Sequence, residues 1–402
     1  MRPSRALLTA ALTAGLALTP LAAVAAAPVQ EDPSVLSWGA GRTGQLGNGA
    51  TRDSSTPVPV TSLVRGDVDK ISAGGTSSSD SFAVALIDET VKSWGHNSSG
   101  QLGNGKRTNR SVPTAVSRLT NVKDVAAGGE HALALDANGR VYAWGDNNYG
   151  QLGNSRTGDM RSVPSAIKGM PKVKQVSAGC DFSMALTEKG DVYAWGRGVY
   201  GQLGSGSRAT SSVPRQIEGL ENVSEIDAGC HHALALTADK TVKAWGKNTS
   251  GQLGDSSTRS STTPVDVDWI EEVSDIEAGA NHNYAITEDG RVWGWGNNQN
   301  NQLLEADPAT AKNSRQFTNR TAPIGIPRLE GAEQVAAGAQ HGIAVFGEDI
   351  FAWGHNTEGQ VGNSTTSNMT NMESVSTVNT LNASPTVQHV AASLGGNTSY
   401  AY

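Results

Sequence analysis

Two cysteines and four histidines are the side chains of this 402-residue chain with the clearest potential for chemistry. Cys180 and Cys230 could form a disulfide bridge, and a ring of imidazoles could bind a metal ion. The four histidines share one position of a sequence repeat: His131, His232, His282 and His341. Phe82 and Phe182 take that position in other copies, so it favours a planar ring that packs. We therefore expect structural histidines with hydrogen bonds to the backbone, not a metal site.

Two glycine-rich stretches, 39–44 and 196–201, match the Gly-x-Gly-x-x-Gly fingerprint of dinucleotide-binding proteins. A working fingerprint needs a strand before it and a helix after it. Another copy of the repeat has His-Asn-Ser-Ser between Gly95 and Gly100, so we interpret both stretches as turns. The chain also has no nucleophile elbow, His-Glu-x-x-His or Cys-x-x-Cys motif. We predict no catalytic residue, no cofactor and no metal.

The repeat that carries these residues is marked by tryptophan. Trp-Gly dipeptides recur at intervals of 50 to 58 residues and begin at Trp38, Trp94, Trp144, Trp195, Trp245, Trp295 and Trp353. Only Trp269 and Trp293 lie outside this pattern. Most copies continue with Gly-Gln-Leu-Gly, a proline, an apolar pair three residues apart, and Ala-Gly before a short alternating run. Each copy has four short extended runs, and Asn138-Gly139 is typical of a hairpin turn.

Seven such units predict an all-β, seven-bladed β-propeller with four antiparallel strands per blade. The 47 glycines and the 17% of charged residues exclude a coiled coil. Residues 35–38 form the second half of a unit and residues 387–402 the first half, so we expect these terminal strands to share one blade and close the ring. Neighbouring inner positions of such a ring lie about 6–7 Å apart, near the limit for a disulfide. Cys180 and Cys230 are therefore either bridged or two buried thiols.

Residues 1–25 have the pattern of a signal peptide. Arg2 and Arg5 precede an uncharged apolar stretch, and residues 23–25 supply a small-x-small cleavage site. We expect a secreted, extracellular chain with no membrane insertion after cleavage, a short linker at 26–34 and the propeller at 35–402. The formal charge of −7, without any charged run, argues against binding to nucleic acid.

The Trp-Gly, Gly-Gln-Leu-Gly, Pro and Ala-Gly-x-x-His pattern closely resembles the regulator of chromosome condensation repeat family over residues 35–402. The resemblance implies a seven-bladed propeller. The namesake of the family is a nuclear guanine nucleotide exchange factor that binds chromatin, and the export signal and acidic charge argue against that role here. A secreted bacterial propeller that inhibits β-lactamases would share the extracellular location of this chain. Its binding face is richer in aromatic residues, whereas the residues between Ala-Gly and His are polar in this chain.

We expect a partner to bind the loops of the ring, because binding residues concentrate in loops on a rigid scaffold. Meandering strands place the Ala-Gly-x-x-His turns and the Gly-Gln-Leu-Gly loops on one face. Tyr149 and Tyr200 precede the latter motif in adjacent copies and either act as exposed anchors or cover their own turns. The neighbouring loops and the longest loop, 297–323, supply further candidates: Arg107, Arg110, Arg156, Arg161, Arg208, Arg315, Phe317 and Arg320.

These observations predict a secreted, non-catalytic and monomeric scaffold that binds a protein partner through this loop face. Two alternatives stay open. One is an inhibitor of an extracellular enzyme such as a β-lactamase. The other is a hydrolase or lyase that acts on extracellular glycans, for which a buried carboxylate pair in a pocket would be the structural sign.

Overall fold

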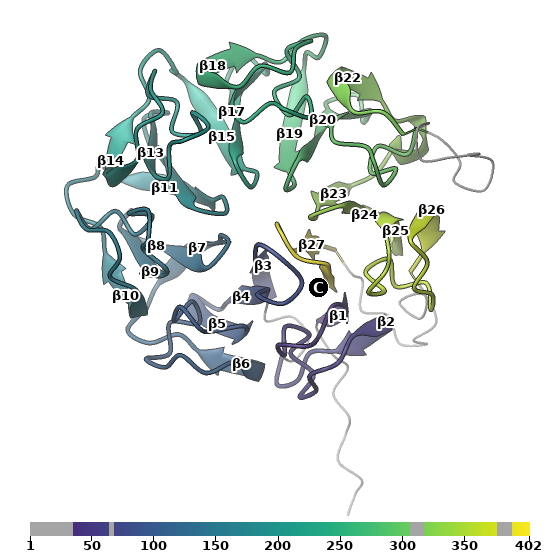
Figure 1. Ribbon diagram of the computed structural model, residues 1–402, viewed down its shortest axis with the longest axis horizontal. Coiled ribbons are helices and arrows are strands. Elements are labelled where there is room, and N and C mark those ends of the chain that lie inside the picture. The colour runs from purple at the N-terminus through teal and green to yellow at the C-terminus, as the bar shows by residue number, and fades with distance from the viewer. Residues whose placement is uncertain (1–34, 64–67, 306–316, 376–387) are drawn as a thin grey trace, which may run out of the picture. The chain divides into compact units, whose positions relative to one another are not determined.

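Seven four-stranded antiparallel sheets are arranged in a ring (Figure 1). They are seen in a computed structural model that describes residues 35–63, 68–305, 317–375 and 388–402. The predicted all-β, seven-bladed propeller is therefore confirmed. Among the described residues the helical structure is one short 3-10 turn, η2 (Pro327–Leu329). The expected signal peptide and linker lie outside the described residues.

We number the blades I to VII and give their strands from the innermost outward. Blade I has β3 (Val68–Gly74), β4 (Phe82–Ile87), β5 (Thr90–Gly95) and β6 (Arg110–Ala115). Blade II has β7 (Val122–Ala127), β8 (His131–Asp136), β9 (Val141–Gly145) and β10 (Arg161–Ala166). Blade III has β11 (Val173–Ala178), β12 (Phe182–Thr187), β13 (Val192–Gly196) and β14 (Ser211–Gln216). Blade IV has β15 (Val223–Ala228), β16 (His232–Thr237), β17 (Val242–Gly246) and β18 (Ser261–Asp266).

The remaining blades complete the ring. Blade V has β19 (Val273–Ala278), β20 (His282–Thr287), β21 (Val292–Gly296) and β22 (Arg320–Gly325). Blade VI has β23 (Gln334–Ala337), β24 (His341–Phe346), β25 (Asp349–His355) and β26 (Met369–Ser374). Blade VII has β27 (Val390–Ala392), β28 (Thr398–Ala401), β1 (Leu36–Gly39) and β2 (Ser54–Pro59).

Blade VII joins the two ends of the described chain, as expected. Strand β28 lies between β27 and β1 in the order β2-β1-β28-β27. Leu36 is paired with Ala401, and Trp38 with Ser399. Because antiparallel strands from opposite ends of the sequence share one sheet, the ring has no open blade within the described residues.

The repeated tryptophan and glutamine connect each blade to the one before it. Trp144 Nε1 donates a hydrogen bond of 2.8 Å to the backbone carbonyl of Gln101 in the preceding blade. The same contact recurs at all seven tryptophans, with distances from 2.6 to 3.0 Å. A Cβ at Gly103, where φ is +62°, would lie 2.8 Å from Trp144 Nε1, so the last glycine of the motif admits the indole. The sequence repeat is thus an interblade contact.

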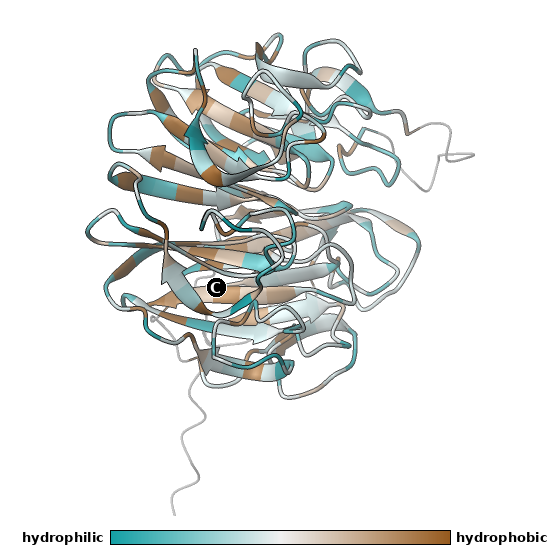
Figure 2. Ribbon diagram, turned by 60° about the vertical axis from the view of Figure 1, so that its left-hand side comes forward, coloured by the Kyte–Doolittle hydropathy of each residue, from teal (hydrophilic) through white to brown (hydrophobic). Residues whose placement is uncertain are grey.

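Apolar side chains from facing blades form the core between them. Leu133 and Leu135 of blade II pack with Val173, Val176 and Trp195 of blade III in one buried cluster. Equivalent clusters lie between the other blades. Figure 2 shows hydrophobic residues along the strands and hydrophilic residues in many of the loops. The loops are therefore held on a rigid frame.

The four repeated histidines are fully buried between blades, and three of them bond a side chain of the next blade instead of the backbone that we expected. The fourth, His282, has no such side-chain bond within the described part of the chain, and Gly342 takes the equivalent position in the next blade. His131 Nε2 lies 2.9 Å from Ser183 Oγ in the next blade. Because Ser183 Oγ donates its own proton to the carbonyl of Gln151, His131 Nε2 is the donor in this pair. His232 Nε2 likewise donates to Asn283 Oδ1 over 2.6 Å.

Candidate functional site

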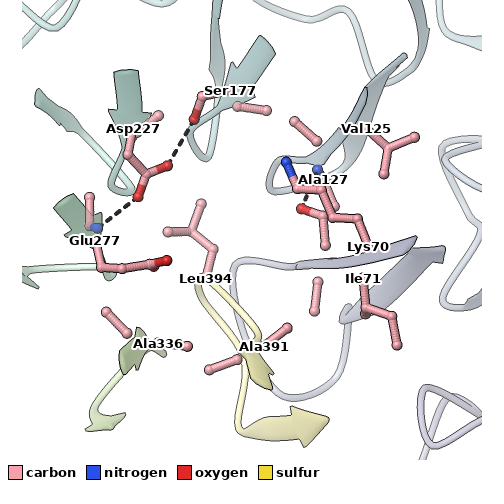
Figure 3. A pocket seen from close by; sticks show the side chains of 18 of the residues that line it. Lys70, Ile71, Val125, Ala127, Ser177, Asp227, Glu277, Ala336, Ala391 and Leu394 are labelled. Carbon is pink, nitrogen blue, oxygen red and sulfur yellow. Dashed lines mark hydrogen bonds between the residues drawn. The ribbon is translucent and has the colours of Figure 1, made fainter. Parts of the chain in front are cut away.

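Carboxylates gather in a cavity of about 210 Å³ at the centre of the ring. Asp227 and Glu277 come from the innermost strands of blades IV and V, and in the view of Figure 3 Leu394 lies between them and Lys70. Asp227 accepts hydrogen bonds from Ser177 Oγ at 3.0 Å and from the backbone N–H of Ala278 at 2.7 Å. Burial is the main cause of a raised pKa for Asp227 and Glu277.

Glu225 of the cavity and the neighbouring Asp275 are in contact and so do not form the separated pair that glycan hydrolysis requires. Burial raises the pKa of Glu225 to about 9, helped by the charges of Asp275 and Asp227. Burial also raises the pKa of Asp275 to about 6, and its carboxyl is in hydrogen-bonding contact with that of Glu225. A sugar must fit between the acid and the nucleophile, which are at least about 5 Å apart in such enzymes. The cavity is also below the roughly 300 Å³ at which ligand pockets usually begin.

A second group of side chains lies on the loop face, where we predicted two tyrosines as anchors for a partner. Tyr149 belongs to the β9–β10 loop of blade II and Tyr200 to the β13–β14 loop of blade III. Arg197 lies between them: its Cζ is 4.7 Å from the centre of the Tyr149 ring and 5.6 Å from that of Tyr200. Arg197 Nη1 donates a hydrogen bond of 2.9 Å to Asp181 Oδ2. One guanidinium thus stacks with both tyrosines and is held by a carboxylate.

The next blade extends this group with a second ring and a second cation. The rings of Tyr200 and His231 are 5.0 Å apart and tilted by 35°. Lys247 Nζ lies 5.8 Å from the centre of the Tyr200 ring. Burial lowers the pKa of His231 to about 4, so its ring is neutral at neutral pH. We call this group the loop-face cluster; it comprises Tyr149, Asp181, Arg197, Tyr200, His231 and Lys247.

A disulfide bridge underlies the loop-face cluster. Cys180 and Cys230 are bonded, with their Cα atoms 4.5 Å apart. Our estimate of 6–7 Å was too long, because the two turns also share a backbone hydrogen bond of 3.0 Å from Cys180 N to the carbonyl of Cys230. Asp181 and His231 directly follow the two cysteines. The bridge therefore fixes the spacing of two members of the cluster.

Two buried donors at the loop-face cluster have no acceptor among the described residues. In blade II the side-chain amide of Gln151 donates to Asp146 Oδ2 over 2.8 Å. The residue equivalent to Asp146 in blade III is Arg197, which is itself a donor. Gln202 Nε2 and Arg197 Nε consequently have no partner among the described residues, and both atoms are buried. Leaving these two donors unsatisfied costs free energy of folding at this position.

The predicted arginines do not form part of the loop-face cluster. Arg161 is paired with Asp159 at 3.1 Å, and Arg320 with Glu305. Three others are exposed and have no ion pair within the described ranges: Arg107, Arg156 and Arg208. Arg110 is half-buried. The side chain of Phe317 is only 5% exposed, so it is not a surface contact, and Arg315 lies outside the described residues.

Replacing both cysteines by serine is expected to lower the free energy of unfolding by about 2–4 kcal/mol. The bridge closes a loop with a sequence separation of 50 residues, and its loss returns chain entropy to the unfolded state. Urea denaturation of Cys180→Ser/Cys230→Ser beside the unchanged chain measures the effect. A midpoint equal to that of the unchanged chain would show that the bridge contributes nothing to stability.

The described parts of the chain contain neither a metal-binding cluster nor a membrane-spanning helix. No three His, Cys, Asp or Glu side chains there are arranged to hold a metal ion. No helix in the same residues combines the length and apolarity needed to cross a membrane.

Comparison with protein families agrees with this architecture. The model of the RCC1-like domain matches residues 22–232. Models of the regulator of chromosome condensation (RCC1) repeat match later segments of the chain: 223–252, 273–302, 241–286 and 289–345. The loop-face cluster falls within the first two matched regions.

Curated relatives match parts of the chain. The ultraviolet-B receptor UVR8 of Arabidopsis thaliana is 32% identical over 178 residues, which cover 43% of this chain and 40% of the receptor. The Protein RCC2 homolog of Xenopus laevis is 34% identical over 139 residues, or 34% of this chain and 27% of that protein. The matched segments thus span less than half the length of these relatives.

Solved structures match nearly the whole chain. Prp20p of Saccharomyces cerevisiae, whose structure was described with its binding to Gsp1p and histones, has a TM-score of 0.78 and 25% identity, covering 92% of this chain and 91% of Prp20p. Human WBSCR16 has a TM-score of 0.75 and 22% identity, and the match covers 91% of this chain and 98% of WBSCR16. This match shows a similar fold. The repeat, the ring and these matches agree, and the chain belongs to the RCC1-like domain family.

Proposed function

We propose that this chain is a secreted, non-catalytic scaffold that binds a protein partner at the loop-face cluster. The observation that carries the proposal is the stack of Arg197 between Tyr149 and Tyr200. Tyrosine and arginine are the side chains most often found at the energetic centres of interfaces. The Cys180–Cys230 bridge supports secretion, because disulfides persist in oxidising compartments.

The charges of the cluster favour an acidic segment of the partner. Arg197 and Lys247 contribute two positive charges, and the negative charge of Asp181 cancels one of them. A carboxylate of the partner would pair with the part-exposed guanidinium of Arg197 and with the ammonium of Lys247. Prp20p, a relative in fold, is described as binding other proteins. An extracellular enzyme held in this way would be blocked, so an enzyme inhibitor is one form of the same proposal.

Replacing Arg197 or Tyr200 by alanine is expected to weaken binding of the partner at least about tenfold. Tyr200 is half-buried at the surface, so its loss removes contact area of the interface and little of the core. The partner is first captured from native culture fluid and envelope extract on the immobilised chain and identified. Its dissociation constant is then measured for each variant by surface plasmon resonance.

Arg140→Ala is the matched control, because Arg140 is an exposed arginine on the β8–β9 hairpin, at the opposite face of blade II. It removes the same charge as Arg197→Ala and should leave the affinity unchanged. Equal losses in the two variants would contradict the proposal, since they would show a general effect of charge. So would a fall in melting temperature that accounts for the whole loss of binding.

A further inference from the structure

Trp269 is the most exposed large apolar side chain among the described residues. It lies in the connection from β18 to β19, and 78% of its surface is exposed, while the seven repeat tryptophans are buried. This connection lies at the same face of the ring as the β20–β21 hairpin, opposite the loop-face cluster. No ring contact or cation–π contact of Trp269 occurs within the described parts of the chain. The indole therefore lies at the surface without an aromatic or cationic neighbour in these parts of the chain.

The backbone at Trp269 is unfavourable for a bulky residue. Its φ is +66°, in the left-handed region that a large side chain rarely adopts. The equivalent residues in four other connections are also left-handed: Ser62, Arg118, Gly169 and Gly219. A Cβ at Gly169 or Gly219 would have no atom within 4 Å, so this position faces open space. The fold requires a left-handed residue here and does not require tryptophan.

Acidic residues lie close to Trp269 in the sequence. Asp268 precedes Trp269, and a cleft of about 550 Å³ begins two residues after it. The cleft is lined by Glu271, Glu272, Glu288, Asp289, Arg291 and the half-buried Trp293, together with Thr287. Three of the four carboxylates of the lining have ion pairs: Glu272 and Glu288 with Lys240, at 3.2 and 2.6 Å, and Asp289 with Arg291 at 3.2 Å. The four carboxylates still outnumber these two cations. The exposed Glu271 has no ion pair in the described ranges.

We propose that Trp269 and this acidic cleft form a second docking surface, which binds a lysine- and arginine-rich segment of a protein. A cation of such a segment is attracted to the face of an indole, and its neighbours would pair with the carboxylates of the cleft. The polarity is opposite to that of the loop-face cluster, so the two surfaces select partners of different charge. The surface is independent of the proposed function.

Binding of a fluorescein-labelled lysine- and arginine-rich decapeptide, measured by fluorescence anisotropy at low salt, tests the proposal. We expect binding to the full chain, and binding at least about tenfold weaker for Trp269→Gly. Because glycine accepts the left-handed backbone, the melting temperature of Trp269→Gly should not fall below that of the unchanged chain. Absence of peptide binding would overturn the proposal. A clear loss of stability in Trp269→Gly would assign tryptophan a structural role and overturn it as well.

The preceding blade supplies a matched control for charge. Its connection reads Glu218-Gly219-Leu220-Glu221, with the same acidic pattern around glycine instead of tryptophan. Glu271→Gln should weaken peptide binding several-fold, whereas Glu221→Gln should leave it unchanged. Equal effects of the two variants would show that the peptide is attracted to the acidic protein in general, and would overturn the proposal of a docking surface. Binding to neutral phosphatidylcholine vesicles, or self-association that competes with the peptide, would overturn the choice of a basic segment.

Discussion

Removal of residues 388–402 is expected to abolish cooperative folding of the propeller. The deletion takes away β27 and β28, and β1 then loses the partner with which Leu36 and Trp38 are paired. It also removes Tyr400, which is fully buried, packs edge-on against Trp94 and donates a hydrogen bond of 2.7 Å to the carbonyl of Gln45. Loss of one large buried side chain costs about 3–5 kcal/mol, and a whole domain is stable by only about 5–15 kcal/mol.

Near-ultraviolet circular dichroism during thermal unfolding measures this effect. The deletion variant should show no cooperative transition, and its open strand edges should promote aggregation. Tyr400→Phe is the control, since it keeps the ring and loses one hydrogen bond, at a cost of about 1 kcal/mol. A cooperative transition of the deletion variant within a few degrees of the unchanged chain would contradict closure by blade VII.

The fold could be predicted because the motifs of the repeat correspond to contacts between neighbouring blades. Every Trp-Gly pairs with the glutamine of the preceding blade, so seven copies of two motifs predict seven interfaces. Ring closure was readable for the same reason, because each terminal half-unit lacks strands that the other supplies. The period of the repeat is therefore enough to predict the number of blades and the closure of the ring, without any distance between residues.

The loop-face cluster was only partly predictable, because its chemistry arises where the repeat varies. Tyr149 and Tyr200 are recognisable in the sequence, but Arg197 lies in a stretch that we interpreted as an ordinary turn. The residue after Trp-Gly could have revealed it, because in other copies of the repeat this residue contacts the side-chain amide of the glutamine in the same copy. Asp146 and His355 bind the glutamine amide at that position, and an arginine there cannot. Phe317 was misplaced because an apolar residue in a polar loop can be buried against the blades.

Acidification is expected to destabilise the propeller through its four buried histidines. Burial lowers the pKa of His131 and His232 to about 4, and that of His282 and His341 to about 3, from an ordinary value of 6.5. As the pH falls below 6.5, the unfolded chain takes up protons that the folded chain excludes. Stability is therefore complete above pH 6.5 and decreases until the pH reaches the folded values. At 1.36 kcal/mol per pKa unit, each histidine costs roughly 3–5 kcal/mol once the pH is below its folded pKa.

The central carboxylates have the opposite effect in the alkaline direction. Burial, with the charges of Asp275 and Asp227, raises the pKa of Glu225 from 4.5 to about 9. A raised carboxyl pKa stabilises the fold fully below the unfolded value, and this contribution is lost as the pH rises towards 9. Lys70, which opposes this rise as the nearby cation, is paired with Asp124 at 2.7 Å. The four histidines lower stability below pH 6.5 and Glu225 lowers it above pH 4.5, and four groups outweigh one, so greatest stability is expected at about pH 6.5–7.

Two substitutions separate these contributions in melting temperatures measured from pH 4 to pH 9. His131→Phe should flatten the acid side of the profile and leave the alkaline side unchanged, because phenylalanine already occupies the equivalent buried position at Phe82 and Phe182. Glu225→Gln should do the reverse and raise the melting temperature at pH 8–9, since an amide need not lose a proton. Profiles that stay parallel to that of the unchanged chain in both variants would contradict this account. The pH dependence would then arise from surface charge, which acts at many exposed sites and is insensitive to either change.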